Sequence, residues 1–422
     1  MNQVGSESME EILNVIPPRA RVLVGSGAAC PITLLGAWAA RPSALPAEVC
    51  SLLLLGELPF VSGDTPQRHN AFFMSPAVRD AMARGAADFT PALLSAIPNL
   101  LRTVLKPDVA LIQVSPPDAN GRCTLGVSVD IVKAAVESAG IVIAEINPNM
   151  PRTCGSTGIE RSHIHHAVHV DHPIPQLPLH APNDVELAIG RHVAALVNDR
   201  DTLQVGIGAI PNAVLAALRD RRDLGVHTEM FSDGVMDLMQ RGVITNRAKS
   251  VHPGRTVTSF VMGSHKLYAF VDGNEDILFL PSDEVNAPAA VALNDRMVSI
   301  NSALSVDLTG QVCADSIGPR IFSGVGGQLD FVRGAQASAG GRSVIALPST
   351  ACGGSVSRIA VELAAGSGVT VTRSEVHMVA TEYGVAELRG KSIAQRVHLL
   401  AGIAHPKFRD ELLAGARRHH WI

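Results

Sequence analysis

Aromatic residues are scarce in this 422-residue chain, which has only two tryptophans and two tyrosines. So few rings exclude an aromatic platform on which sugars or nucleic acid bases would stack. Charged residues are also sparse, at 18% of the sequence, and the formal net charge of −4 gives no reason to expect a nucleic acid partner. No stretch approaches the ~18–20 uninterrupted apolar residues of a transmembrane helix, so we expect no membrane span.

Targeting signals and cysteine pairs are also lacking. The segment from Met1 to Ile12 carries three glutamates and no basic residue, which argues against a signal or transit peptide. No two of the six cysteines form a C-x-x-C pair, and a chain of this length needs no disulfide framework. We therefore expect reduced thiols in a cytoplasmic protein.

Apolar character is what the sequence has in excess. Hydrophobic residues make up 46% of the chain, and the mean hydropathy is +0.22. Such values are typical of an α/β fold whose strands are buried on both faces. Because 422 residues exceed the size at which a single core stops growing, we expect two domains.

One pattern occurs twice along the chain. A buried strand runs into a Gly-x-Gly turn and then a helical pattern at Val22–Cys30, and again at Leu203–Pro211. The matching glycines are Gly25 and Gly206, and 206 − 25 = 181 is close to half of the 422 residues. The repeat predicts two tandem, similar α/β domains with mostly parallel sheets.

The segment 171–183 is the predicted boundary between these domains. Its four prolines forbid a helix and suit an extended linker, and a helical pattern resumes at Asp184. We therefore predict domains at residues 1–183 and 184–422. Short β-branched runs predict further strands at Val109–Val114, Ile141–Ile146, Val257–Val261, Ile277–Leu280, Val344–Ala346 and Val369–Val371.

Three segments contain the candidate chemistry. Glu229, within His227–Gly234, is a candidate covalent nucleophile. The turn that begins at Gly206 could take a phosphate or pantetheine group. Ser323–Gln328 holds three glycines, whose backbone N–H groups can turn inward to bind an oxyanion. Together these are the parts of a thioester-exchange site.

The Gly-x-Gly turns have more than one interpretation. A dinucleotide fold would have a third glycine, where the two copies have Cys30 and Pro211. Neither turn is followed by the Lys-Ser/Thr of a P-loop. A tight strand–helix turn and a backbone cradle for a nucleotide-like ligand both stay open.

Basic residues and histidines form two further clusters. The basic residues between 247 and 266, Lys249 and Lys266 among them, could hold the phosphates of coenzyme A or form an ordinary solvated face. Five histidines lie between His163 and His172, two of them at the i, i+4 spacing of helical zinc ligands. They lack an H-E-x-x-H arrangement and run into the proline-rich segment, so we expect no metal site.

Over nearly its whole length, the sequence resembles the acetyl-CoA hydrolase/transferase family, which includes the 4-hydroxybutyrate and butyrate:acetate CoA-transferases. The resemblance rests on the His227–Gly234 segment and on further blocks that follow the family's order. These blocks are Asp108–Gly121, Asn147–Arg152, Gly242–Asn246, Ser323–Gln328, Pro348–Thr350 with Gly353 and Gly354, Thr381–Ala386, and His405 with Pro406.

The resemblance implies the class I CoA-transferase fold and a role for several residues. It implies that Glu229 is the catalytic glutamate, that Gly327 with Gly326 beside it donates a backbone N–H to the oxyanion, and that Asn286 contacts the thioester region. The N-terminal domain would supply part of the carboxylate pocket. With Lys249 from the basic cluster, the residues expected to contact coenzyme A are Gly206, Ile207, Gly208, Ala209, Ile210, Lys249, Met262, Gly263 and Lys266.

The expected activity moves CoA from acetyl-, succinyl- or butyryl-CoA to a small carboxylate such as 4-hydroxybutyrate or butyrate. The route is a glutamyl-CoA thioester with ping-pong kinetics, in a homodimer without a cofactor beyond the CoA thioester. A dicarboxylate transferase for itaconate or succinate stays open, with Arg68 and His69 as candidate partners of the second carboxylate. An acyl-CoA hydrolase on the same scaffold also stays open. The Glu229, Asn286 and Gly327 set argues against a CoA-binding module without catalysis.

Overall fold

The chain forms two compact units. The computed structural model describes residues 8–41, 46–56, 58–62, 66–178 and 181–422. Unit 1 comprises residues 1–92, 96–177 and 259–283, and unit 2 comprises residues 93–95, 178–258 and 284–422. The change of unit at 177–178 lies near the predicted boundary at 183–184. Segment 93–95 precedes the predicted boundary but packs with unit 2, and segment 259–283 follows the boundary but packs with unit 1. Contacts rather than chain order decide where a segment folds.

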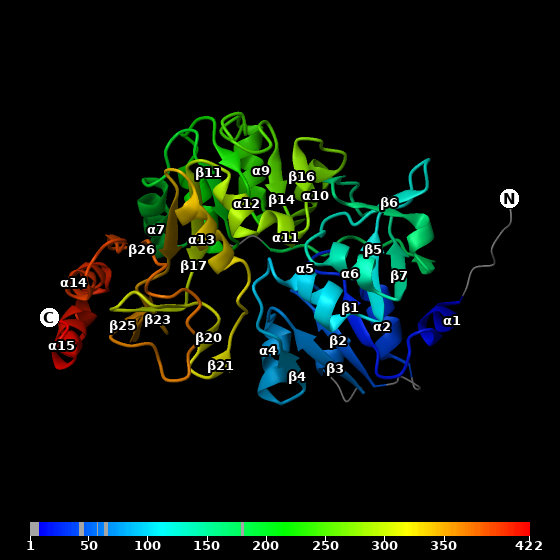
Figure 1. The fold of residues 1–422 in the computed structure, drawn as a ribbon, viewed down its shortest axis with the longest axis horizontal. Helices are drawn as coiled ribbons and strands as arrows, with labels where there is room; N and C mark the ends of the chain where they lie inside the picture. Colours follow the sequence, from blue (N-terminus) through cyan, green and yellow to red (C-terminus); the bar gives the residue numbers. More distant parts are fainter. Residues whose placement is uncertain (1–7, 42–45, 57, 63–65, 179–180) are drawn as a thin grey trace. The chain divides into compact units, whose positions relative to one another are not determined.

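Unit 1 is built on a seven-stranded sheet whose neighbouring strands all run parallel (Figure 1). Strand β5 is buried at every position and β7 at all but its first, as expected for parallel strands with both faces covered. In spatial order the strands are β10 (His166–His169), β7 (Ile141–Ile146), β5 (Val109–Val114), β1 (Arg21–Val24), β2 (Ala47–Ser51), β3 (Gln67–Ala71) and β4 (Ala87–Phe89).

Helices and shorter strands complete unit 1. Helix α2 begins against a buried carboxylate, since Glu145 Oε1 accepts a hydrogen bond of 2.7 Å from the Leu34 N–H. The helices are α1 (Met9–Asn14), α2 (Ile32–Ala39), α3 (Pro59–Ser62), α4 (Pro76–Ala83), α5 (Ile97–Leu100), η1 (Leu101–Leu105), α6 (Val132–Ser138), η2 (Arg161–His163) and α10 (His265–Val271). The shorter strands are β6 (Arg122–Thr124), β8 (Cys154–Gly155), β9 (Gly158–Glu160), β15 (Phe260–Val261) and β16 (Ile277–Phe279).

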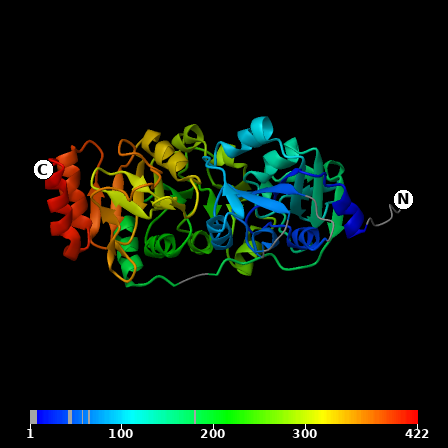
Figure 2. The same ribbon diagram turned by 90° about the horizontal axis from the view of Figure 1, so that it is seen from below.

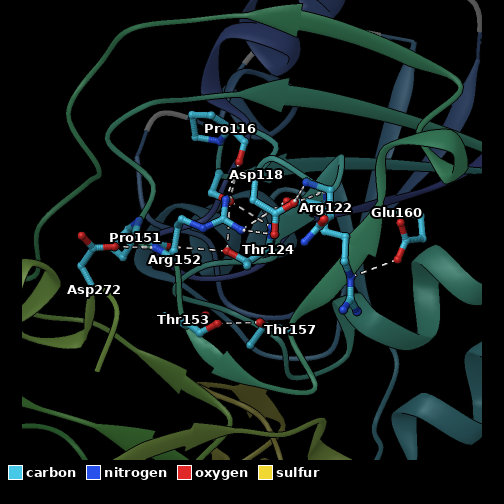
Figure 3. Close-up of polar contacts among 12 residues, drawn as sticks. Pro116, Asp118, Arg122, Thr124, Pro151, Arg152, Thr153, Thr157, Glu160 and Asp272 are labelled. Atoms are coloured by element: carbon cyan, nitrogen blue, oxygen red, sulfur yellow. Dashed lines mark hydrogen bonds and ion pairs between the residues drawn. The ribbon is translucent and has the colours of Figure 1, made fainter. Parts of the chain in front are cut away.

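Arg152 connects several loops of unit 1 (Figure 3). Its guanidinium donates to the Pro116 carbonyl at 2.6 Å, to the Asp118 carboxylate at 3.3 Å and to the Arg122 carbonyl at 3.2 Å. Its backbone N–H donates to Asp272, directly after helix α10, at 2.7 Å. One residue therefore joins the loop after β5 to the end of α10.

Unit 2 contains a six-stranded sheet of the same kind (Figure 1). Its strands pair in parallel from β12 to β26, and β27 closes the edge in antiparallel pairing with β26. In spatial order they are β12 (Gly225–Val226), β11 (Thr202–Val205), β17 (Met297–Ser302), β22 (Arg342–Ala346), β26 (Met378–Thr381) and β27 (Gly384–Glu387). As the repeat predicts, β11 runs through its glycine turn into α8, just as β1 does into α2.

A lobe of short strands and the C-terminal helices complete unit 2. Figure 2 shows α14 and α15 side by side, and α14 also packs on β27. The helices are α7 (Asp184–Ala194), α8 (Ala209–Ala217), α9 (Asp233–Gln240), α12 (Pro288–Ala292), α13 (Gln328–Ala337), α14 (Ile393–Ile403), η3 (Pro406–Phe408) and α15 (Arg409–Arg418), and α11 (Ser282–Val285) spans residues of both units. The short strands are β13 (Met230–Phe231), β14 (Thr256–Thr258), β18 (Ser305–Asp307), β19 (Val312–Cys313), β20 (Ser316–Ile317), β21 (Arg320–Ile321), β23 (Thr350–Ala351), β24 (Val356–Ser357) and β25 (Ile359–Ala360). Within the described ranges, no helix has both the length and the apolar character to cross a bilayer.

The strand predictions succeed where the sequence is continuously apolar. Val109–Val114 and Ile141–Ile146 are confirmed as β5 and β7. The strand predicted at Val369–Val371 is wrong, because this segment contributes only an isolated bridge from Val371 to Val312. No β-branched run marked β3 or β17, whose sequences are Gln-Arg-His-Asn-Ala and Met-Val-Ser-Ile-Asn-Ser.

Polar side chains of both strands form hydrogen bonds with neighbouring strands. On β17, Ser299 Oγ donates to Gln204 Oε1 of β11 at 2.8 Å. On β3, the His69 ring nitrogen Nε2 lies 2.7 Å from Ser51 Oγ at the end of β2. Paired polar groups can be buried at little cost, so these strands form without an apolar pattern.

Replacing Arg152 by methionine should destabilise unit 1, because the carbonyls and carboxylate that it contacts lose their donor. The expected loss is about 1–3 kcal/mol in the free energy of unfolding, measured by urea denaturation. Arg68→Met is the matched control, since its ion pair with Asp88 is 3.5 Å long and more than half exposed, and such pairs contribute roughly 0–1 kcal/mol. Equal losses in both variants would contradict the connecting role of Arg152.

Candidate active site

The candidate site lies at the carboxyl edge of the unit 2 sheet. The four parallel strands β12, β11, β17 and β22 all end at this edge, where open α/β sheets bind their ligands. The segments that follow them begin at His227, Gly206, Ala303 and Leu347 respectively. The predicted glycine turn at Gly206 and the predicted segment of Glu229 therefore lie at the same edge of the sheet.

Glu229 is held directly against Asn286. Asn286 Nδ2 donates a hydrogen bond of 2.8 Å to Glu229 Oε2, and Asn286 is fully buried whereas Glu229 is partly exposed. The backbone of Glu229 is fixed as well, since its carbonyl accepts a bond of 3.1 Å from Thr258 Oγ1. The carboxylate is thus oriented by an amide donor, on a residue that is partly exposed.

Gly327 completes the group at the N-terminus of helix α13. A Cβ on this residue would lie 2.0 Å from Glu229 Oε2 and 2.2 Å from Asn286 Nδ2, so any side chain here would displace both groups. Gly326 beside it has φ +58°, a conformation that favours glycine. The first N–H groups of a helix have no partner within the helix, and they favour negative charge. The arrangement can therefore hold a carboxylate and stabilise an oxyanion at the same place.

Residues 93–95 hold this glycine turn in place. The Leu94 N–H donates to the Gly326 carbonyl at 3.0 Å, while Ser95 donates through both its N–H and its Oγ to the Asp330 carboxylate of α13. Burial raises the pKa of Asp330 to about 6. Residues 94 and 95 thus hold both the glycine turn that precedes α13 and the first turn of this helix.

A cavity of about 330 Å³ opens beside the predicted glycine turn. Ile207, Gly208, Ala209 and Ile210 line it on one side, and the half-buried Arg358 lies on another. Gly208 has φ +111°, whereas Gly206 would have no atom within 4 Å of an added Cβ. The remaining lining residues are Glu186, Pro211, Ser302, Ala303, Leu304, Ala314, Phe322, Ser323, Ala346 and Pro348.

Lys249 is placed differently from the other residues expected to contact coenzyme A. It is 5% exposed, and its Nζ donates to the carbonyls of Val226 at 2.8 Å and Arg255 at 2.7 Å. Burial lowers its pKa to about 7. Because both contacts are internal, Lys249 supports strand β12 from inside and presents no ammonium to a phosphate. A solvated face, one of the two interpretations of the basic cluster, does not describe this buried residue.

Met262, Gly263 and Lys266 belong to unit 1. Met262 is buried with its sulfur 3.4 Å from where a Cβ of Gly27 would lie, and the Gly263 carbonyl accepts from Leu177 at 3.1 Å. Lys266 is exposed in the first turn of α10. Of these three, Lys266 presents a cationic group to solvent.

The proposed dicarboxylate pair and the histidine cluster are not assembled as sites. Arg68 faces Asp88 at the surface whereas the neighbouring His69 is 1% exposed, so the two side chains lie on opposite faces of β3. This arrangement does not support the candidate pairing of both side chains with one carboxylate. In the histidine cluster, His166–His169 form strand β10 instead of a helix, and His172 bonds the buried Glu145 at 3.1 Å. Among the described residues, no group of three or more His, Cys, Asp or Glu could hold a metal ion.

Arg358 and Ser302 were not found from the sequence. Arg358 follows strand β24 and Ser302 ends β17, and neither lies in a glycine-rich segment. Only the meeting of strand ends at the cavity brings them near Ile207. The remaining signal, an arginine within an apolar run, is too common to point to a ligand.

Comparisons with known proteins identify the family of the chain. The chain matches the acetyl-CoA hydrolase/transferase N-terminal domain over residues 6–174 and the acetyl-CoA hydrolase/transferase C-terminal domain over residues 263–416. It is 46% identical over 408 residues to 4-hydroxybutyrate coenzyme A transferase of Clostridium kluyveri, covering 96% of this chain and 95% of that protein.

Two solved structures are similar over nearly the whole chain. RipA from Yersinia pestis has a TM-score of 0.93 at 35% identity, covering 99% of this chain and 98% of that one. The 4-hydroxybutyrate CoA-transferase of Porphyromonas gingivalis has a TM-score of 0.83 at 40% identity, covering 97% and 96%. Fold and sequence together define an enzyme of the CoA-transferase class. The chain belongs to the acetyl-CoA hydrolase/transferase family, which confirms the resemblance of its sequence blocks.

Gly327→Ala should lower turnover by about 10² or more, since the new methyl group displaces Glu229 and Asn286, and a displacement of about 1 Å can cost that much. Turnover is measured as acyl-CoA consumed in the presence of a carboxylate acceptor. The control is Gly402→Ala in helix α14, where an added Cβ meets no atom within 4 Å and turnover should be unchanged. Wild-type turnover in a folded Gly327→Ala protein would show that the close contact is not needed.

Proposed function

We propose that this enzyme transfers CoA between an acyl-CoA and a small carboxylate through a covalent intermediate on Glu229. The observation that supports this most strongly is the contact of the Glu229 carboxylate with Asn286, at 2.8 Å, directly at the Gly327 N-terminus of helix α13. Nucleophile, amide donor and oxyanion-binding backbone are the groups that acyl exchange needs.

The first half of the proposed reaction leaves CoA on the enzyme. A Glu229 carboxylate oxygen attacks the thioester carbonyl, the C–S bond breaks, and a mixed anhydride and a CoA thiolate result. The thiolate then attacks the glutamyl carbonyl of the anhydride. The first acid leaves as its carboxylate, and a glutamyl-CoA thioester remains.

The second half runs these steps in reverse with another acid. The incoming carboxylate attacks the glutamyl thioester and releases the thiolate, which then attacks the acyl carbonyl of the new anhydride. The new acyl-CoA departs and Glu229 is a carboxylate again. Because the first product leaves before the second substrate reacts, ping-pong kinetics follow. Each addition creates a tetrahedral oxyanion, for which the Gly327 N–H is the proposed donor.

The cavity beside Gly206–Ile210 is the proposed site for part of coenzyme A. Small residues at Ala209, Ala303 and Ala346 leave room, and the guanidinium of Arg358 supplies positive charge for an anionic group. Burial lowers the pKa of Arg358 from its very high usual value, and an arginine so shifted is still charged. Remote binding here can be used to orient the thioester at Glu229.

The names of its relatives indicate which substrates to test first. 4-Hydroxybutyrate is the first acceptor to test, followed by butyrate, acetate and succinate. Itaconate has less support, because Arg68 and His69, the candidate partners of its second carboxylate, lie on opposite faces of β3. We also propose that the protein is a cytoplasmic homodimer and that it uses no cofactor beyond the CoA thioester.

Acyl-CoA hydrolysis is the second candidate function. It is favoured by one observation, the partial exposure of Glu229, because water that reaches the anhydride would hydrolyse it. The two activities differ in a simple way: consumption of acyl-CoA without any carboxylate acceptor indicates hydrolysis, and consumption that requires the acceptor indicates transfer.

Glu229→Gln should abolish transfer, by at least about 10⁴-fold, the scale seen when a covalent nucleophile is removed. In the wild type, incubation with acetyl-CoA and then borohydride should reduce the glutamyl thioester to an alcohol, and peptide mass spectrometry should find it at residue 229. Glu362→Gln, at a mostly exposed carboxylate, is the control and should keep full activity. Modification at another residue, or transfer by the Glu229→Gln variant, would refute the mechanism.

Gly206→Ala should raise the KM for acyl-CoA several-fold with little change in thermal stability. The protein itself leaves room for the methyl group, since no atom lies within 4 Å of the added Cβ. An effect on KM must then come from the approach of a ligand to this backbone. Melting temperature and initial rates are measured together, with Gly402→Ala again as control. An unchanged KM would remove Gly206 from the CoA site.

A further inference from the structure

His227 contacts the segments that carry Asn286 and Gly327 and lies in the segment that carries Glu229. It precedes Glu229 by two positions in the same segment. Its ring nitrogen Nε2 lies 2.8 Å from the carbonyl of Val285, the residue before Asn286. Its ring also packs edge-to-face on Phe331 of α13, with centroids 6.3 Å apart. The Phe331 N–H in turn donates to the Gly327 carbonyl at 3.1 Å.

The hydrogen bonds of His227 fix its tautomer. A carbonyl only accepts, so Nε2 carries the proton that is donated to Val285. Nδ1 is then the acceptor for Asn294 Nδ2, at 3.3 Å. Burial, assisted by the nearby charge of Lys249, lowers the pKa of His227 to about 4. The imidazole is therefore neutral at neutral pH, with one nitrogen donating and the other accepting.

The backbone around His227 is held from several sides. The His227 N–H donates to the Leu203 carbonyl at 3.0 Å, and the buried Lys249 donates to the carbonyl of Val226 directly before it. The ring itself is 3% exposed. Because both the ring and its backbone are held in place, the ring sets the position of each segment that it contacts.

We propose that His227 is a positioning residue, whose neutral ring sets the distances among Glu229, Asn286 and Gly327. This inference rests on the proposed transferase function and adds a residue that does not touch the substrate. Without the ring, the Val285–Asn286 segment and the first turn of α13 lose their common contact with the segment of the nucleophile. The Asn286–Glu229 hydrogen bond and the Gly327 N–H, the proposed oxyanion donor, then no longer lie at the same place.

The test compares His227→Phe with His377→Phe. His377 is a buried histidine of unit 2 whose pKa burial also lowers, and it lies directly before β26, at the opposite edge of the sheet from the site. For His227→Phe we expect a kcat about 10–100-fold lower, because small displacements of reacting groups have effects of this size, with the KM for acyl-CoA within about threefold. His227→Gln, which can still donate to Val285, should recover part of the loss. His377→Phe should lower the melting temperature comparably and leave kcat unchanged.

Each outcome decides a specific point. A folded His227→Phe protein with wild-type kcat, while the wild type forms the glutamyl thioester, would overturn the positioning role alone. A wild type that forms no glutamyl thioester would overturn the proposed function, and this inference with it. If His227→Phe does not fold, Asn294→Ala decides, since it keeps the imidazole and removes its Nδ1 partner. A lowered kcat at unchanged KM supports the role, and an unchanged kcat refutes it.

Discussion

The close approach of Glu229 and Asn286 to Gly327 is the constraint on which the site depends. A carboxylate oxygen and an amide nitrogen occupy the space that any side chain at residue 327 would need, at 2.0 and 2.2 Å from its Cβ position. The contact places the proposed nucleophile, an amide donor and a helix N-terminus together. Exchange of one thioester for another is nearly balanced in energy, so placement of these groups is the main contribution that the protein needs to make.

The parallel sheet of unit 2 makes this approach possible. Strands β12, β11, β17 and β22 deliver four chain segments to one edge, and the interior of the unit fixes them there. Lys249 and His227 act from inside, through hydrogen bonds to backbone carbonyls, although both are residue types that sequence patterns assign to ligands. Buried polar groups with complete partners specify one arrangement, since any shift leaves a donor or acceptor unpaired.

Much of the fold was predictable because apolar runs and glycine turns are local signals. Strands β5 and β7 and the repeated strand–turn–helix units follow from hydrophobic pattern alone. Strands β3 and β17 do not, because their burial depends on partners such as Ser51 and Gln204 in other strands. Segment 259–283 belongs to unit 1 for the same reason, since it packs against residues that are distant from it in the sequence.

For the site, the sequence by itself determined the family, the candidate nucleophile Glu229 and the glycines whose missing side chains matter. Each of these is a matter of residue type within a short motif. Only the tertiary structure decided that Asn286 bonds Glu229, that Arg358 lines the cavity, and that Lys249 points inward. Such facts depend on which chain segments meet at a sheet edge and on the direction of each side chain, and neither is encoded in the spacing of residues along one segment.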